Sequence, residues 1–252
     1  MQVLELVKLR FRNARTWVYI VGSIKNIIDE GVFLATSEGL SLRALDSSRV
    51  VMVDLFYPKE AFDEYSASGD EMFGVSFDVF NKVLARGQNY ESLELQASGD
   101  SLIVAFEGRG RREFKIPQIS LSVEKLPEPR ISFSVMAKLM NSVFIDAINS
   151  VEEVADSITI SAPSDDRLHF IGMGDVEKVE VELSKDDQNL IDIRVDSHDK
   201  ATYSVEYFDD MIKAARGADQ VTLQYAQDAP ARVQFDYEGG GRLVFYVSPR
   251  IE

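Results

Sequence analysis

The sequence predicts an α+β protein made of two similar, sheet-rich domains, each with two helices. Three observations predict this fold class. Short runs of alternating apolar and polar residues indicate half-buried strands, because successive side chains of a strand point to opposite faces. A few longer windows repeat apolar residues every three or four positions, which indicates amphipathic helices. A shift of about 128 residues brings the two halves of the chain into correspondence, so one set of elements occurs twice.

The first copy begins with a strand and a helix. Residues 7–12 (VKLRFR) alternate strictly and predict a strand. From residue 13 to 28, apolar side chains recur at helical spacing, at Trp17, Val21, Ile24 and Ile28. We therefore expect a helix over this window, with these four side chains facing the core.

The rest of the first copy is mostly strand. Alternating runs at 32–35, 40–44 and 50–56 are separated by the turn-forming stretches 37–39 and 46–48. A second helix is expected over Ser76–Arg86, with Ser76 as its N-cap. Two or three further strands close the copy, with a hairpin turn at Gly108-Arg109-Gly110.

The second copy repeats this order. Residues 39–42 correspond to 167–170, 76–80 to 204–208, and 114–117 to 246–249. Helices are expected over Ala137–Asn149 and Ser204–Arg216, with a turn at 239–241. We expect an N-terminal domain over 1–117, an extended, proline-containing connector over 118–130 and a C-terminal domain over 131–252.

The composition excludes several classes of protein. The chain has 252 residues, 27 Lys and Arg against 42 Asp and Glu, two His and no Cys. The net charge of −15 argues against a general affinity for polyanions or acidic membranes. The lack of cysteine removes disulfides, thiolate metal sites and thiol nucleophiles. Because no signal peptide or membrane-spanning run is visible, we expect an intracellular protein of the cytoplasm and nucleoid, or of the nucleus in a eukaryote.

The sequence contains few candidates for chemistry. His169 and His198 have no metal-ligand spacing, and no phosphate-binding glycine loop or nucleophile elbow is present. Adjacent carboxylates could bind Mg²⁺, but all four pairs fall in polar loops or on a polar helix face, where a solvated surface is the simpler reading. We expect no enzyme, no cofactor and no metal. The four pairs are Glu152-Glu153, Asp165-Asp166, Asp186-Asp187 and Asp209-Asp210.

Three motifs resemble those of one protein family. Residues 45–50 (LDSSRV) resemble the "(M/L)DSS(H/R)V" turn of the proliferating cell nuclear antigen family, the sliding clamps of archaea and eukaryotes. Residues 245–251 (FYVSPRI) resemble the family's "YYLAPKI" ending. Residues 126–128 (LPE) fall where the family has "IPE" in its interdomain connector. The resemblance covers about residues 7–252.

This resemblance implies a DNA clamp fold that assembles as a pseudo-six-fold ring of three subunits around double-stranded DNA. Helices would line the hole, and sheets would form the outside. The ring would be a homotrimer or a heterotrimer with related subunits. Implied partners are DNA polymerase, flap endonuclease, DNA ligase and the clamp loader, bound through hydrophobic peptide motifs, with no membrane involved. An alternative of another class is an acidic checkpoint or assembly scaffold of the same fold that does not encircle replicating DNA.

The charges can be compared with this implied ring. The helical windows 12–28, 76–86, 137–149 and 204–216 hold eight basic and five acidic residues, a net +3. The remainder then holds 19 basic and 37 acidic residues, a net −18. Helix macrodipoles alone also favour acids in first turns and bases in last turns, so the charge pattern has two explanations. The expected DNA-facing residues are Arg12, Arg15, Lys25, Lys82, Arg86, Lys138, Lys213 and Arg216.

The resemblance also implies a pocket for partner peptides, between the connector and the C-terminal tail. Its positions in this sequence come from the turn, the connector and the second domain. Burial in the core is the alternative explanation for Val50, Met52 and Tyr246. The residues are Leu45, Arg49, Val50, Met52, Leu126, Pro127, Pro230, Tyr246, Ser248, Pro249 and Ile251.

Two expected strands of opposite charge are candidates for subunit contacts. The strand at 111–116 carries Arg111, Arg112 and Lys115, and the segment at 176–183 carries Glu177, Glu180 and Glu182. Pairing them between subunits would hide two exposed sheet edges. Ordinary alternation of solvent-facing positions would also explain these charges.

Overall fold

The computed structural model describes residues 7–67, 69–122 and 126–250. Contacts divide them into two compact units that are not continuous in sequence. Unit 1 takes the described chain up to Ser47, Val53–Leu126 and Tyr237–Leu243, and unit 2 takes Ser48–Met52, Pro127–Asp236 and the chain from Val244. Each unit therefore contains a short segment from the other half of the chain.

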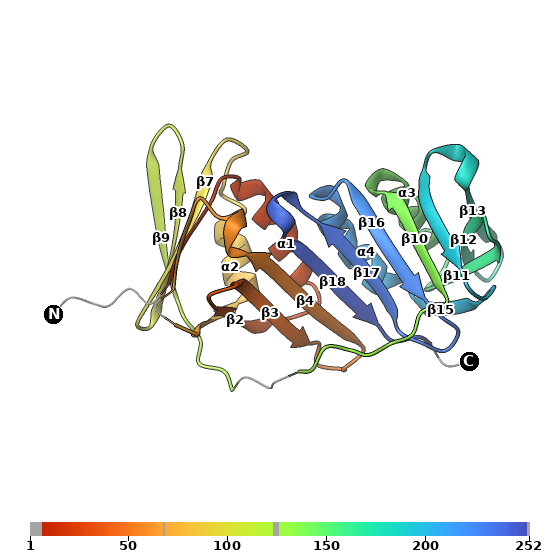
Figure 1. The fold of residues 1–252 in the computed structure, drawn as a ribbon, viewed down its shortest axis with the longest axis horizontal. Helices are drawn as coiled ribbons and strands as arrows, with labels where there is room; N and C mark the ends of the chain where they lie inside the picture. The colour runs from red at the N-terminus through yellow and green to blue at the C-terminus, as the bar shows by residue number, and fades with distance from the viewer. Residues whose placement is uncertain (1–6, 68, 123–125, 251–252) are drawn as a thin grey trace. The chain divides into compact units, whose positions relative to one another are not determined.

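Unit 1 contains two sheets and two helices. In chain order the elements are β1 (Val7–Phe11), α1 (Ala14–Ile24), β2 (Glu30–Ala35), β3 (Gly39–Leu45), β4 (Val51–Pro58), β5 (Glu64–Ala67), β6 (Glu71–Ser76), α2 (Phe77–Leu84), β7 (Ser92–Ser98), β8 (Ser101–Glu107) and β9 (Arg111–Pro117). One sheet has the order β5-β1-β7-β8-β9, and the other strands are ordered β4-β3-β2-β6. Figure 1 shows α1 and α2 behind β2, β3 and β4.

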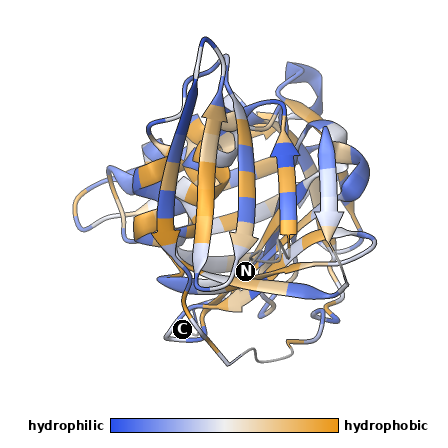
Figure 2. Cartoon of the chain, turned by 90° about the vertical axis from the view of Figure 1, so that its left-hand side faces the viewer, coloured by the Kyte–Doolittle hydropathy of each residue, from blue (hydrophilic) through white to orange (hydrophobic). Residues whose placement is uncertain are grey.

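Alternation along the strands places one face of each sheet in the core. β1 reads buried, half-buried, buried along VKLRF. Figure 2 shows the resulting bands of hydrophilic and hydrophobic residues along the sheet that contains β7, β8 and β9. The strand β9 is the most solvated of the three, since only Ile116 among its residues is buried. It lies at the edge of its sheet.

The first helix forms where its periodicity predicts. Asn13 caps it, since its Oδ1 accepts a hydrogen bond from Arg15 N at 3.0 Å. Trp17, Val21 and Ile24 are buried as expected, and so is Ile28, although the helix ends before it at Ile24. Trp17 packs against Phe11, with ring centroids 4.4 Å apart, and this contact joins the helix to β1.

Unit 2 repeats the same order. Its elements are β10 (Val135–Met140), α3 (Asn141–Glu152), β11 (Ser157–Ser164), β12 (Arg167–Met173), β13 (Lys178–Ser184), β14 (Leu190–Val195), β15 (Lys200–Ser204), α4 (Val205–Arg216), β16 (Gln220–Tyr225), β17 (Ala231–Asp236) and β18 (Arg242–Val247). One sheet has the order β13-β12-β11-β15, and the other strands are ordered β14-β10-β16-β17-β18. The two-copy α+β architecture predicted from the sequence is confirmed.

One expected helix is misplaced. The sequence predicts a helix over Ala137–Asn149, but residues 135–140 form β10, and α3 begins at Asn141. Ala, Lys, Leu and Met are good helix formers, yet Val135, Ala137 and Leu139 alternate with exposed or half-buried neighbours, as in a strand between β14 and β16. Strand pairing has overridden local helix propensity here.

Ser76 occupies the N-cap position of α2, as expected, but its side chain makes no capping hydrogen bond. The first helical N–H, that of Phe77, instead donates to the backbone carbonyl of Asp29 at 2.9 Å.

Within the described ranges, no helix is long and apolar enough to cross a membrane.

Candidate nucleic-acid interface and partner-binding surfaces

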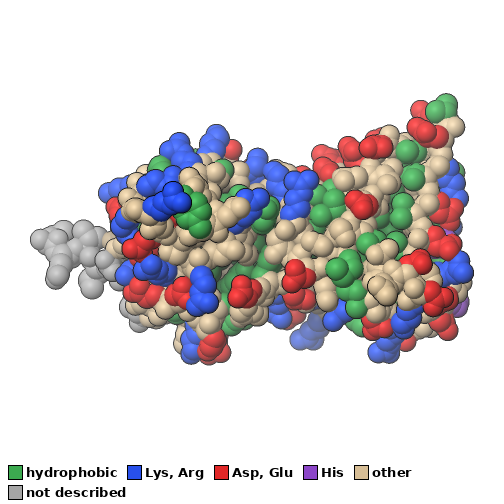
Figure 3. All heavy atoms as spheres, turned by 90° about the horizontal axis from the view of Figure 1, so that it is seen from above, with side chains coloured by type: hydrophobic (Ala, Val, Ile, Leu, Met, Phe, Trp, Pro, Cys, Tyr) green, Lys and Arg blue, Asp and Glu red, His purple; other side chains and the backbone are tan. Residues whose placement is uncertain are grey.

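The helices of unit 1 are surrounded by basic side chains. Arg15 is on α1 and Lys82 is on α2, while Arg12, Lys25 and Arg86 directly flank these helices. Asp78 is the single acidic residue on α1 and α2. Because α1 and α2 pack against each other, these basic residues belong to one helical layer. In Figure 3, Lys and Arg side chains gather on the left-hand part of the molecule, which is unit 1.

Two of these bases are held by exposed ion pairs. Arg12 lies 3.0 Å from the Asp63 carboxylate with 83% of its side chain exposed. Lys82 lies 2.6 Å from Asp78, one helical turn earlier, and is 70% exposed. Hydrogen bonding to Lys82 holds the pKa of Asp78 below its ordinary value. Exposed pairs of this kind contribute little free energy, so both cations can exchange their partner for a phosphate.

The two other arginines stack on aromatic rings. Arg15 donates from Nε to the Tyr19 hydroxyl at 2.6 Å, and its guanidinium lies 5.1 Å from the centroid of that ring. Arg86 lies over Phe114 of β9, 5.0 Å from the centroid. Stacking leaves the outer edge of a guanidinium able to donate hydrogen bonds.

The helices of unit 2 have the opposite charge. They carry Lys213 and Arg216, both exposed, near the end of α4. Against these stand five acids, which are Asp146 and Glu152 on α3 and Glu206, Asp209 and Asp210 on α4. Counted over all four helices as the structure bounds them, four bases face six acids, a net −2. The expected excess of +3 on the helices is therefore wrong, because Arg12, Lys25 and Arg86 only flank helices, Lys138 is on β10, and α3 extends to Glu152.

Lys138 is also misassigned by the sequence. It lies on β10, not on a helix, and it is exposed. Its neighbours Ala137 and Leu139 are buried and belong to the strand face that packs against α3. Since successive side chains of a strand point to opposite faces, Lys138 is on the sheet face away from the helices. It therefore does not belong to the helical set.

Part of the expected peptide pocket is assembled within unit 2. The Ser248 N–H donates to the carbonyl of Val50 at 2.9 Å, which joins the turn to the C-terminal tail. Arg49, in the same turn, has a left-handed φ of 59°. Val50, Pro230, Ser248 and Pro249 are half-buried and Arg49 and Pro127 are exposed. Met52 and Tyr246 are each only 7% exposed and belong largely to the core.

The remaining pocket positions belong to unit 1 or lie outside the described residues. Leu45, at the end of β3, is half-buried. Leu126 is half-buried, and its carbonyl accepts a hydrogen bond from Arg43 Nη1 at 3.0 Å. The connector begins against β6, where Ile119 N donates to Gly74 O at 3.1 Å; a Cβ at Gly74 would lie 2.1 Å from the Ile119 carbonyl oxygen. Ile251 lies outside the described residues.

Both strands expected at subunit contacts are at sheet edges. β9 ends the order β5-β1-β7-β8-β9, and β13 begins the order β13-β12-β11-β15. On β9, Arg111 lies 2.8 Å from Glu94, Arg112 lies 2.6 Å from Glu91, and Lys115 is exposed. The bond to Arg111 holds the pKa of Glu94 below its ordinary value.

The acidic edge also has internal partners. On β13, Glu180 lies 2.6 Å from Lys178 and 2.8 Å from His169 of β12. Glu182 pairs with Arg167 and lies 3.1 Å from the same histidine. Hydrogen bonds from Lys178 and His169 lower the pKa of Glu180. Glu177, exposed, directly precedes β13.

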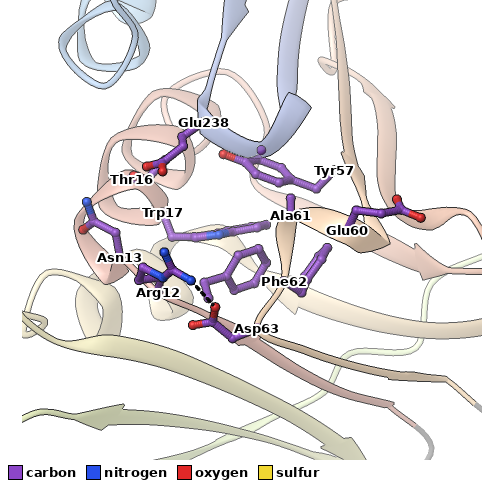
Figure 4. Close-up of a pocket in the computed structure, with 12 residues that line it drawn as sticks. Arg12, Asn13, Thr16, Trp17, Tyr57, Glu60, Ala61, Phe62, Asp63 and Glu238 are labelled. Carbon is purple, nitrogen blue, oxygen red and sulfur yellow. Dashed lines mark hydrogen bonds and ion pairs between the residues drawn. The ribbon is translucent and has the colours of Figure 1, made fainter.

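A small pocket in unit 1 is lined in part by carboxylates. It has a volume of about 210 Å³ and lies between the start of α1 and the chain after β4. Figure 4 shows Trp17 edge-on below Tyr57, with Arg12 and Asp63 joined at one side. Burial, together with the Glu238 carboxylate, raises the pKa of the Tyr57 hydroxyl. Among the residues that the structure describes, no three His, Asp or Glu side chains gather as metal ligands.

Sequence reasoning missed one cluster near α2. Tyr90 is 59% exposed, and the Arg109 guanidinium lies 5.8 Å from its ring centroid. The two residues are distant in sequence. Pairing of β7 with β8 in register, Ser92 opposite Glu107, brings them together. The combination of an expected hairpin at 108–110 with a preceding strand is the signal that could have found them.

Models of two domains of one family match almost the whole chain. The proliferating cell nuclear antigen N-terminal domain matches residues 6–126, and the C-terminal domain of the same antigen matches residues 127–250. A protein named DNA polymerase sliding clamp 3, from Aeropyrum pernix, is 49% identical over 243 residues, 96% of this chain and 97% of that protein. The DNA polymerase sliding clamp of Thermofilum pendens is 36% identical over 98% of this chain and its own full length.

Solved structures give the same match. The crystal structure of PCNA from Thermococcus kodakaraensis superposes with a TM-score of 0.92 at 28% identity, over 97% of this chain and 100% of that one. A chain from the PCNA2–PCNA3 complex of Sulfolobus tokodaii gives a TM-score of 0.91 at 28% identity, with the same coverage.

Proposed function

The chain belongs to the proliferating cell nuclear antigen family, and we propose that it is a sliding clamp that encircles double-stranded DNA and tethers DNA polymerase as a processivity factor. The observation that carries the proposal is the match of both domains, over almost the full chain, to proteins named DNA polymerase sliding clamps. No relative reported above is named as a checkpoint or assembly scaffold, so the acidic-scaffold alternative is not favoured. The action is topological and needs no catalytic group of the chain itself.

DNA contact is non-specific in this proposal. The bases around α1 and α2 meet phosphates, whose spacing does not depend on sequence. Arg12 and Lys82 are free to leave weak, exposed ion pairs when a phosphate approaches. Two bases at the end of α4, Lys213 and Arg216, add a smaller contribution. Acidic side chains elsewhere on the chain repel DNA, which favours contact at the basic residues around α1 and α2.

Ring closure would come from strand pairing between subunits. The β9 edge of one subunit would pair with the β13 edge of the next, which removes two exposed edges at once. Arg111, Arg112 and Lys115 would meet Glu177, Glu180 and Glu182, so unlike edges attract and like edges repel. The ring would be a homotrimer or a heterotrimer; the complex of two PCNA chains from Sulfolobus tokodaii supports the second arrangement.

Partner proteins would dock by a hydrophobic peptide at the turn and the tail. The bond between Ser248 and Val50 holds the tail beside the turn, and half-buried Val50 and Pro249 offer apolar surface. An extended tail also supplies backbone groups for strand addition. Polymerase, flap endonuclease, ligase and the clamp loader would share this site. In the cell, the protein would be located where the DNA is.

Retention on DNA tests the proposal directly. A loaded clamp stays on closed circular DNA and leaves when the circle is cut, because only the topology holds it. Equal retention on circular and linear DNA would support the acidic scaffold instead. The native mass of the chain alone separates a homotrimer, at three copies, from a subunit that needs related chains.

The peptide site has its own test. A Pro249→Ala/Ile251→Ala variant should bind hydrophobic partner peptides more weakly while keeping its native mass and its retention on circles. The measurement is peptide affinity by fluorescence anisotropy. Unaltered peptide affinity would remove the turn and tail as the docking site.

A further inference from the structure

Tyr90 is an exposed aromatic side chain in a basic setting. It lies in the segment between α2 and β7, and 59% of it is exposed. The guanidinium of Arg109, from the turn between β8 and β9, lies 5.8 Å from its ring centroid. No other aromatic side chain of the described residues is this exposed, and the duplex contact proposed above does not use it.

The local backbone holds Tyr90 in place. Glu91 N donates to Gln88 O at 3.0 Å, and Gln88 N donates to the Glu91 carboxylate at 2.8 Å. The buried Glu91 carboxylate also pairs with Arg112 at 2.6 Å. Gly108 lets the hairpin approach closely, since a Cβ there would lie 2.9 Å from Glu91 Cγ and 3.3 Å from Tyr90 Cδ2. These contacts of Gln88, Glu91 and Gly108 therefore fix the position of Tyr90.

Basic groups also lie in this segment or contact it. Asn89, next to Tyr90, accepts a hydrogen bond from Arg15 Nη1, which connects the segment to α1. Arg86, on the same segment, is exposed, and its carbonyl accepts from Arg112 at 3.0 Å. The nearest acid in this segment, Glu91, is already paired. We call Tyr90, Asn89, Arg15 and Arg109 the Tyr90 platform; Figure 3 shows that basic side chains gather on this unit.

We propose that the Tyr90 platform binds single-stranded DNA, with one unpaired base stacked on Tyr90 and the adjoining phosphates held by Arg15 and Arg109. Any base has a π-face, so the contact needs no sequence. A duplex cannot supply it, because its bases are already stacked within the helix. An acidic peptide would use the arginines but has no need of the exposed ring. The platform would thus hold the unpaired strand where duplex DNA ends.

The test compares variants of the full chain in binding a fluorescent oligothymidine of about a dozen nucleotides. Tyr90→Ala should weaken binding at least about fivefold, the lower limit for loss of one base–aromatic stack. Tyr90→Phe keeps the ring and should stay within about twofold. Arg109→Ala should weaken binding and flatten its salt dependence by about one phosphate contact. An oligomer carrying 5-iodouracil should crosslink to Tyr90 on irradiation.

Several outcomes would overturn the proposal. Equal affinity of Tyr90→Ala and the unaltered chain would do so, as would a crosslink that maps away from the platform. If polyglutamate released the oligomer equally from the unaltered chain and from Tyr90→Ala, the oligomer would be bound by charge alone, without stacking on Tyr90. Retention on circular duplex is measured alongside and should not change in Tyr90→Ala. If the unaltered chain and all variants failed to stay on circular duplex but still bound the oligomer, the clamp function would be contradicted and this proposal would stand.

Discussion

Units 1 and 2 repeat the same order of nine strands and two helices, yet their helices differ in charge. The helices α1 and α2 of unit 1 have two bases and one acid, and three further bases, Arg12, Lys25 and Arg86, flank them. The helices α3 and α4 of unit 2 have two bases and five acids. The two copies of the fold therefore share the pattern of buried residues but differ in the charges on their surfaces. We infer that DNA contact is unequal and comes mainly from unit 1.

Charge reversal at Lys82 on α2 and at Arg86 just beyond it should have the largest effect. Lys82→Glu/Arg86→Glu should abolish clamp-dependent stimulation of polymerase and flatten the plot of log affinity against log salt by about 1.8, or about 0.9 for each phosphate contact. The matched Lys213→Glu/Arg216→Glu variant in unit 2 should lose less than half as much. Native mass serves as the assembly control. Equal losses in the two variants would remove the inequality between the units.

Adding a base to α3 of unit 2 should reduce the difference in DNA contact between the two units. Asp146 is exposed on α3. Asp146→Lys should tighten duplex binding several-fold at low salt and steepen the salt plot by about 0.9 if its side chain gains a phosphate. Asp146→Asn is the control for loss of the negative charge alone. Binding that stays at the unaltered level in both variants would place α3 away from DNA.

Acid should affect two carboxylates differently: Glu94 of β7, which pairs with Arg111 of the β9 edge, and Glu180 of the β13 edge. Arg111 lowers the pKa of Glu94, which is only 7% exposed, whereas Glu180 on β13 is an exposed carboxylate with a lowered pKa. A lowered folded-state pKa gives stability above the ordinary value of 4.5, and that stability is lost as pH falls through the folded pKa.

Glu94→Gln should therefore lower the unfolding temperature at pH 7 by about 2–4 °C and lessen the further loss of stability below about pH 4.5. Glu180→Gln should change neither by a measurable amount, because exposed pairs contribute little. Thermal unfolding followed from pH 7 to about pH 3 checks both. A larger change in unfolding temperature for Glu180→Gln than for Glu94→Gln would contradict this expected order.

The smallest effect is expected at Lys138. Because Lys138 is on the sheet face away from α3, Lys138→Glu should leave duplex affinity within about twofold and the salt plot unchanged. It is also the matched control for the helix variants, since it changes charge by the same amount per residue. A tenfold loss would show that the sheet face contacts DNA.

Much of the fold follows from local pattern. Trp17, Val21, Ile24 and Ile28 repeat at helical spacing, and all four are buried. The strand ranges expected at 32–35, 40–44 and 50–56 fall within one or two residues of β2, β3 and β4. Alternation and helical spacing directly report which face is buried, so they are readable from the chain alone.

The charged site was less predictable for a physical reason. Residues 137–140 have helix propensity, and their strand conformation comes from pairing with residues 190–193 and 220–223, which local sequence does not encode. Moving the start of α3 to Asn141 removed Lys138 from the helices, and its end at Glu152 added an acid. The true ends of the other three helices excluded Arg12, Lys25 and Arg86, which reduced their net charge from +3 to zero. Likewise, Tyr90 and Arg109 meet only through the register of β7 and β8.

The division of the chain into units has a consequence for protein synthesis. Residues 237–243 belong to unit 1, where Tyr237 stacks on Tyr57 with centroids 6.3 Å apart. Gly241 leaves the space that this ring fills, since a Cβ there would lie 2.2 Å from Tyr57 Cζ. The ribosome makes this segment after residues 127–236, which form most of unit 2. Unit 1 therefore completes its core only after most of unit 2 has been made, and both units should mature together.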